Sequence, residues 1–156
     1  MNAHILSLAS LSALLLSAPA PAASPAEVSE AIVRAVKFMH GKVAHHGGYV
    51  YRTSADFTLR EAEGIPGPDT IWIQPPGTPA VGDAMMDAYE VTKDKACLDA
   101  AVDAALAVSR TQLLSGGWDY SGDFDAERGK RLSYARGGDG GSAQVSNVPA
   151  QEPGWH

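Results

Sequence analysis

The fold is decided by residues 78–118, which read TPAVGDAMMDAYEVTKDKACLDAAVDAALAVSRTQLLSGGW. Apolar residues recur in this stretch at helical spacing, in two runs. The first run predicts a helix that starts at Thr78-Pro79, an N-cap followed by proline, and ends near Thr92. The second predicts a helix that starts after Asp94 and stops at Ser115. Because the break between them is so short, we expect a tight antiparallel hairpin.

The two helices have different expected inner faces. That of the first consists of Val81, Ala84, Met85, Ala88 and Tyr89. The expected inner face of the second helix consists of its larger apolar side chains and two alanines: Leu98, Ala101, Val102, Ala105, Leu106 and Leu113. Its outer side carries Asp99 and Asp103. Cys97, the single cysteine, is expected as a small core residue, and one cysteine excludes both an intramolecular disulfide and a cysteine-based zinc site.

A further helix is predicted upstream, over residues 25–44. Ser24 is the expected N-cap, Pro25 occupies the first helical position, and Glu27 completes a capping box. Its apolar positions are Val28, Ile32, Ala35, Val36, Met39 and Val43.

A short motif follows two of these helices. HGGYVY, residues 46–51, comes after the first, and SGGWDY, residues 115–120, comes after the last. In both, glycines allow the chain to leave a helix through left-handed backbone conformations, and an aromatic side chain comes next. The echo points to stacked helical hairpins. The long segment 47–77 contains the β-like runs 49–51 and 71–73. A loop of that length in a compact domain is usually either functional or wrongly assigned as a loop.

The two ends of the chain have a different composition. Residues 1–22 contain an apolar run and small residues typical of a cleaved signal peptide, which predicts a periplasmic or extracellular protein without a membrane partner after cleavage. The alternative is an uncleaved N-terminal anchor. Residues 24–136 form the expected domain, and the glycine-rich residues 137–156 a disordered tail. A net charge of −6 without basic runs argues against nucleic acid as a partner.

Four stretches carry a resemblance to a known family: residues 47–52, 70–79, 87–90 and 116–120. They resemble the pectic acid lyases of bacteria, which are related to the family 10 polysaccharide lyases. The resemblance implies an all-α fold, an incomplete α/α toroid built of antiparallel helical hairpins with long Gly/Pro-rich loops. It also implies β-elimination of polygalacturonate, with calcium neutralising the uronate carboxylate and an arginine removing the α proton. Residues 74–77 lack the family's Asp-Asn pair, so no catalytic residue is assigned.

Candidate site residues follow from side-chain chemistry. A sugar-binding surface is predicted from aromatic residues and one arginine on the loops: Tyr49, Tyr51, Arg52, Trp72, Trp118 and Tyr120. Packing of the aromatics over helix ends is the alternative. Calcium ligands are predicted at Asp119, Asp123 and Asp125, where the alternative is a solvated turn with Asx hydrogen bonds. Further cations that could bind uronate carboxylates are Arg60, Arg128, Lys130 and Arg131. The histidines His40, His45 and His46 have poor spacing for a metal site.

Three functions are therefore weighed for this chain. The first is an exported pectate-lyase-like enzyme acting on acidic polysaccharide. The second is a non-catalytic glycan-binding module on the same scaffold. The third is an inactive fragment of a longer lyase, which should aggregate or oligomerise because its helices leave apolar faces uncovered.

Overall fold

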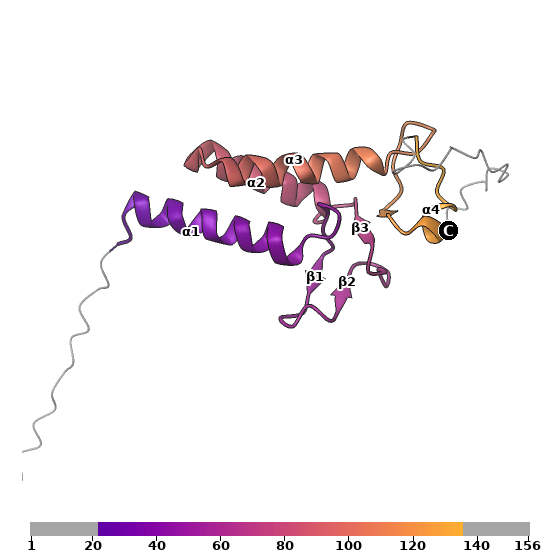
Figure 1. Cartoon of the computed structure of the whole chain (residues 1–156), viewed down its shortest axis with the longest axis horizontal. Helices are drawn as coiled ribbons and strands as arrows, with labels where there is room; N and C mark the ends of the chain where they lie inside the picture. Colours follow the sequence, from indigo (N-terminus) through magenta and orange to yellow (C-terminus); the bar gives the residue numbers. More distant parts are fainter. Residues whose placement is uncertain (1–21, 136–156) are drawn as a thin grey trace, which may run out of the picture.

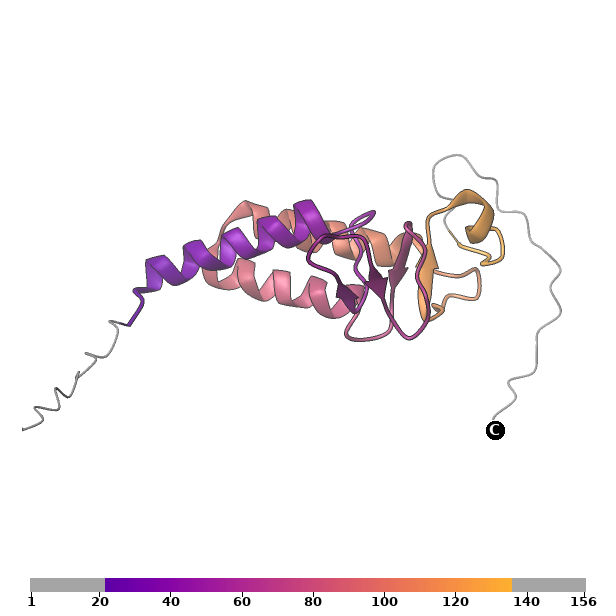
Figure 2. The same cartoon turned by 90° about the horizontal axis from the view of Figure 1, so that it is seen from below.

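The computed structural model describes residues 22–135. Nearly all of the expected signal segment and the whole tail over 137–156 lie outside this range. The three long helices occupy one end of an elongated molecule, and the short strands and the last helix occupy the other (Figures 1 and 2). In the described residues the chain order is α1, a π-helical turn η1, β1, β2, β3, α2, α3, β4 and α4.

Helix α1 (Pro25–Phe38) begins with the expected capping box, since the Ser24 hydroxyl accepts from the Glu27 backbone and the Glu27 carboxylate accepts from the Ser24 backbone. The helix continues as η1 (Met39–Val43), so the predicted span of 25–44 is confirmed with a π-type last turn. Val36 is its one buried residue among those described, and Val28 is 45% exposed.

Helices α2 (Thr78–Thr92) and α3 (Lys95–Arg110) form the predicted hairpin. Lys93 turns the chain between them with φ 55, and Asp94 caps α3 through the Ala96 N–H, 2.8 Å away. The predicted N-cap of α2 is wrong, because Gly77 holds that position. Thr78 is instead fully buried, and its hydroxyl accepts from the backbone N of Tyr49 and donates to the Tyr49 carbonyl.

The predicted inner face of α3 is also wrong, apart from Ala101. The buried residues are small: Cys97, Ala100, Ala101, Ala104 and Ala107. Val102 and Leu106 remain 44% and 42% exposed, and Leu113 lies beyond the end of the helix. A Cβ added to Gly82 of α2 would lie 3.2 Å from the Ala104 Cβ, so the two helices approach closely. Small residues permit that approach, and this selects the alanine face.

Two small antiparallel sheets join the loops, so the fold is not purely all-α, although 47% of it is helical. Strand β1 (Arg52–Thr53) pairs with β2 (Arg60–Glu61). Strand β3 (Thr70–Trp72) pairs with β4 (Ser121–Asp123), with Thr70 opposite Asp123 and Trp72 opposite Ser121. The β-like run at 71–73 is thus largely confirmed as β3, whereas the strand expected at 49–51 begins only at Arg52.

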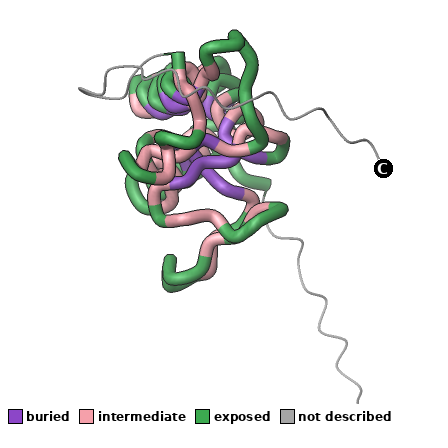
Figure 3. The backbone as a smooth tube through the Cα atoms, turned by 90° about the vertical axis from the view of Figure 1, so that its right-hand side faces the viewer, coloured by how far each residue is buried: buried purple, intermediate pink, exposed green. Residues whose placement is uncertain are grey.

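The core lies where the three long helices meet the first Gly-Gly turn, residues 46–51. It contains Val36 of α1, Met85 and Ala88 of α2, the alanine face of α3, and Tyr49. Figure 3 shows these buried stretches in the middle of the molecule, with exposed loops around them. Helix α4 (Ala126–Gly129) has no buried residue. Within residues 22–135 no helix has the length and apolar character needed to cross a membrane.

Candidate functional site

The two Gly-Gly turns meet on opposite sides of β3. The Trp72 N–H donates to the carbonyl of Tyr49, at 2.8 Å, and the Ile73 N–H donates to the carbonyl of Tyr120, at 2.7 Å. The first glycine of each turn has positive φ, 82° at Gly47 and 88° at Gly116. Helices α1 and α3 therefore deliver both copies of the motif to the same end of the molecule, as the repeat in the sequence predicts.

The aromatic residues of the first turn belong to the core. Tyr49 is 1% exposed, its hydroxyl donates to Met85 Sδ at 3.7 Å, and burial, with Asp103 nearby, raises its pKa to about 12. Tyr51 packs edge-on against Trp72, with ring centroids 5.8 Å apart, and Trp72 is 8% exposed. Neither Tyr49 nor Trp72 has an open face for a sugar.

Arg52, the remaining candidate next to this turn, lies on β1. Its Nε donates to Glu61 of β2 at 2.9 Å, and both side chains are mostly exposed. Arg60, on strand β2 of the same hairpin, donates from its Nη atoms to the carbonyls of Gly67, Pro68 and Thr70. These arginines therefore fasten the 52–70 loop in the described structure.

The aromatic residues of the second turn are open to solvent. Trp118 is 44% exposed and Tyr120 is 64% exposed. The indole Nε1 of Trp118 donates to the carbonyl of Val108 at 2.8 Å, which fixes the ring at the C-terminal end of α3. Gln112 braces the turn through the Gly116 carbonyl, also at 2.8 Å. Of the six predicted sugar-binding residues, these two present aromatic surface at a defined position.

The three aspartates predicted as calcium ligands are occupied by local contacts. Asp119 accepts from the Tyr120 backbone at 2.7 Å. Asp123 accepts from Arg128 Nε at 2.7 Å and from the hydroxyl of Thr70 at 3.0 Å. Asp125 caps α4, accepting from the backbone of Glu127 and of Arg128. The structure thus favours the alternative of hydrogen-bonded turns for all three.

Arg128 is the cation at the centre of this acidic cluster. Besides Asp123, it lies 3.7 Å from Asp69 and 3.7 Å from Asp125. Burial would by itself raise the pKa of Asp123, but the hydrogen bonds donated by Arg128, by the Asp125 backbone and by Thr70 lower it overall. Among residues 22–135 there is no group of three metal-binding side chains able to hold an ion. A calcium ion at these carboxylates would have to displace Arg128, so the residues present do not fit it.

Sequence reasoning missed a histidine-carboxylate pair beside this cluster. His46 Nε2 lies 2.8 Å from Asp69 Oδ1, and the imidazole stacks on Phe124 with centroids 4.6 Å apart. Neither Asp69 nor Phe124 stood out in the sequence, because the loop before β3 and the residue after β4 meet only through strand pairing. The available signal was the position of His46, directly before a Gly-Gly turn that otherwise repeats at 115–120.

Two other histidines were considered as metal ligands. His40 Nε2 lies 2.8 Å from the carboxylate of Asp103. Asp103 belongs to α3 and is far in sequence from Asp69, the partner of His46. Burial, and then the charge of Arg60, lower the pKa of His45. The three histidines therefore do not share one set of ligands.

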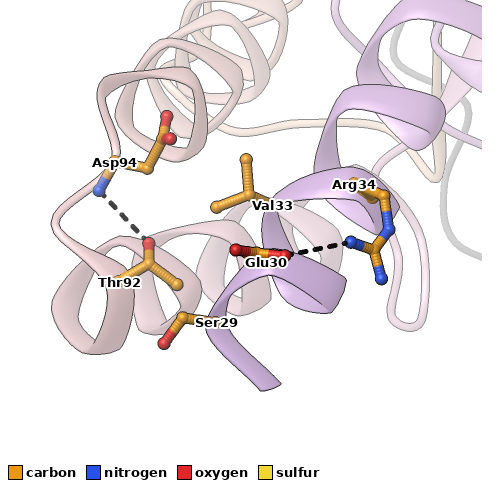
Figure 4. Close-up of a pocket in the computed structure, with 6 residues that line it drawn as sticks. All are labelled: Ser29, Glu30, Val33, Arg34, Thr92 and Asp94. Atoms are coloured by element: carbon orange, nitrogen blue, oxygen red, sulfur yellow. Dashed lines mark hydrogen bonds and ion pairs between the residues drawn. The ribbon is translucent and has the colours of Figure 1, made fainter. Parts of the chain in front are cut away.

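An open groove of about 340 Å³ lies at the opposite end of the molecule, between α1 and the α2–α3 turn (Figure 4). Its polar groups are already paired, since Glu30 faces Arg34 at 3.8 Å and the Asp94 N–H donates to Thr92. The remaining lining residues are Ser29 and Val33. With no convergent free polar groups, this groove is a gap between diverging helices and not the candidate site.

Comparisons with family models, with curated proteins and with solved structures find no match for this chain. The site is therefore described by its own geometry. An exposed aromatic pair and a histidine-carboxylate pair lie along the β3–β4 ribbon at the loop end of the helices.

Proposed function

We propose that this chain is an exported, pectate-lyase-like protein with part of an α/α-toroid architecture, which acts on polygalacturonate by β-elimination at its loop end. The observation that carries the proposal is the meeting of both Gly-Gly turns on the two sides of β3. The ends of helices α1 and α3 thereby contribute to one surface, and that surface bears the exposed Trp118 and Tyr120.

The aromatic pair supports binding of a sugar chain. An indole and a phenol each combine an apolar face with a polar edge, as a sugar ring also does. Trp118 is held in place by its own hydrogen bond to Val108, so little side-chain entropy is lost when a ligand stacks on it.

A cation lies close to the same helix end. Arg110 is exposed and is the last residue of α3, two positions after Val108, and it makes no ion pair within the described part of the chain. A guanidinium at this position can neutralise a uronate carboxylate by two parallel hydrogen bonds. The surface therefore supports an acidic polysaccharide as the ligand, despite the net negative charge of the chain.

The proposed reaction removes the proton next to the uronate carboxylate and expels the 4-linked sugar. It needs a base close to the ligand and positive charge near the carboxylate. Because the aspartates of the second turn do not fit calcium, no step is assigned to the metal that the resemblance implies. Activity is therefore measured both with calcium and with a chelator.

A non-catalytic glycan-binding module is the second candidate function. It is favoured by the Arg128 cluster, where the carboxylates already have their counterion and their hydrogen bonds. A protein that only binds needs the aromatic pair and Arg110, without a base.

The test uses the full chain with polygalacturonate, in calcium and in chelator. Ultraviolet absorbance reports the unsaturated product, and calorimetry with oligogalacturonides reports binding. Product that Trp118→Ala reduces, and that the control Phe57→Ala leaves unchanged, is the expected result; Phe57 is a 41% exposed aromatic on the β1–β2 hairpin. Binding without product supports the module, and absence of both rejects both functions. An aggregated chain without a cooperative melt would support the inactive fragment.

A further inference from the structure

We propose that His46 is the general base of this site and that Asp69 positions it. This inference rests on the proposed function, because it names the group that removes the proton in the elimination. It goes beyond the resemblance, which implies an arginine for that step and assigns none in this sequence.

The hydrogen bond to Asp69 determines which ring nitrogen is basic. Asp69 Oδ1 lies 2.8 Å from His46 Nε2, and an ionised carboxylate can only accept, so Nε2 carries the hydrogen. Nδ1 then carries the lone pair, and no hydrogen bond to it occurs within residues 22–135. The side chain of His46 is 43% exposed, so Nδ1 can be reached by a ligand at the surface.

The ring is fixed on a second side by an aromatic contact. Phe124 stacks on the imidazole with centroids 4.6 Å apart and an interplanar angle of 14°. Phe124 is itself held to the loop of Asp69, since its N–H donates to the Asp69 carbonyl at 3.0 Å. His46 has φ 53, a left-handed conformation that is uncommon for a residue other than glycine. The backbone, the carboxylate and the aromatic ring together fix the orientation of the base.

Asp69 has a second partner besides His46. Arg128 lies 3.7 Å from the outer oxygen of Asp69 and is shared with Asp123 and Asp125. Asp69 is therefore held between the imidazole and the guanidinium, which directs its carboxylate at His46.

His46 lies along the same ribbon as the aromatic pair. Tyr120 is beside Ile73 at one end of the β3–β4 ribbon, and Phe124 is beside Asp69 at the other. Ile73 lies four positions after Asp69, about 13 Å away at the usual rise of a strand. The proposal requires that a sugar chain stacked on the second turn extends over this distance to the imidazole.

The step is balanced without a further reactant. Nδ1 of His46 takes the proton next to the carboxylate, the electron pair of that C–H bond forms the new C=C bond, and the bond to the 4-linked oxygen breaks. The imidazolium then returns the proton to the leaving oxygen, which regenerates the neutral base.

The test compares two histidine-aspartate pairs of equal length in the same chain. His46→Gln should lower the rate of product formation by about 100-fold or more, the usual contribution of general base catalysis. His40→Gln removes the pair with Asp103, also 2.8 Å long, and should leave the rate within about twofold. Calorimetric binding of oligogalacturonide should persist in both variants. Equal rates for His46→Gln and the parent chain would overturn the assignment.

Two additional variants separate catalysis from folding. Asp69→Asn removes the carboxylate that orients the imidazole, so it should lower kcat with little change in KM. His46→Ala should regain part of its activity when free imidazole is added, whereas a purely structural histidine would not be rescued. An unchanged kcat in Asp69→Asn together with no rescue rejects His46 as the base. If the parent chain makes no product, the proposed function itself fails, and this base fails with it.

Discussion

The two Gly-Gly turns share the pattern Gly-Gly-aromatic-x-Tyr and have opposite environments. A Cβ added to Gly47 would lie 2.6 Å from the carbonyl oxygen of Asp103, and one added to Gly48 would lie 2.3 Å from Ile71. At Gly116 an added Cβ would meet nothing within 4 Å. The first turn is enclosed by α3 and β3, whereas among the described residues the glycines of the second turn have open space around them.

The difference shows that a repeated local motif does not imply a repeated role. Tyr49 of the first copy is a core residue at 1% exposure, and Trp118 of the second is 44% exposed. Local sequence sets the backbone path of each turn, and neighbouring elements decide what its aromatic side chain does. The aromatic side chain of the first copy therefore contributes to the core, and that of the second copy is open to solvent.

The largest expected effect is on stability and comes from truncating the two aromatics. Tyr49→Ala should lower the free energy of unfolding by about 3–5 kcal/mol, since it empties a fully buried site. Trp118→Ala should cost about 1 kcal/mol, because it loses a half-exposed ring and one hydrogen bond. Urea denaturation of both variants measures the two values. Similar losses for the two would contradict the comparison.

Replacing a glycine in each turn should also destabilise the first turn more than the second, with smaller losses of stability than the aromatic truncations. Gly48→Ala should cost about 1–3 kcal/mol, because the new methyl group overlaps Ile71. Gly117→Ala should stay within about 0.5 kcal/mol of the parent chain, since the nearest atom is Ser115 Oγ at 3.9 Å. Thermal melts under identical conditions decide this, and a large cost at Gly117 would mean that the second turn is also enclosed.

For ligand affinity, substitutions in the second turn should have the larger effect, which is the opposite of the order expected for stability. Trp118→Ala should weaken oligogalacturonide binding about tenfold, a loss of about 1.4 kcal/mol. Tyr51→Phe, which keeps the ring that packs on Trp72, should change the affinity less than twofold. Isothermal calorimetry on folded variants provides the measurement, and unchanged affinity in Trp118→Ala would remove the second turn from the binding surface.

The melting temperature at low pH should depend on Asp123 and not on Asp119, and this is the smallest of the four expected effects. The pKa of Asp123 is lower in the folded chain, so its stabilising contribution is complete above the unfolded value of about 3.9. That contribution is lost as the pH falls through the folded value. Asp123→Asn should therefore flatten the fall in melting temperature below about pH 4, and Asp119→Asn should leave it unchanged. Parallel curves for Asp123→Asn and the parent chain would contradict this.

Much of the fold follows from local signals. The capping box at Ser24 marks the first helix, the break at Lys93-Asp94 marks the hairpin, and both termini of α2 lie within a residue of the prediction. Capping and periodicity act within a few residues of chain, so they can be recognised without the tertiary structure.

The candidate site was predicted only in part. Trp118 and Tyr120 are exposed at the loop end as expected, but Tyr49 and Trp72 are core residues. The aspartates of 119–125 have Arg128 and backbone donors as partners, and the sequence gives no indication of which arginine does this. His46 acquires its partner from Asp69, 23 positions away, through the pairing of β3 with β4.

The sequence by itself determined the three long helices, the capping box at Ser24 and the two glycine turns, because these depend on backbone conformations and contacts between near neighbours. Only the tertiary structure decided that α3 buries its alanines and leaves Val102 and Leu106 half-exposed, since the close approach of Gly82 excludes larger side chains. It also decided which turn is enclosed and which carboxylate each of His40 and His46 faces. Those outcomes depend on how distant segments pack, and no local pattern records that packing.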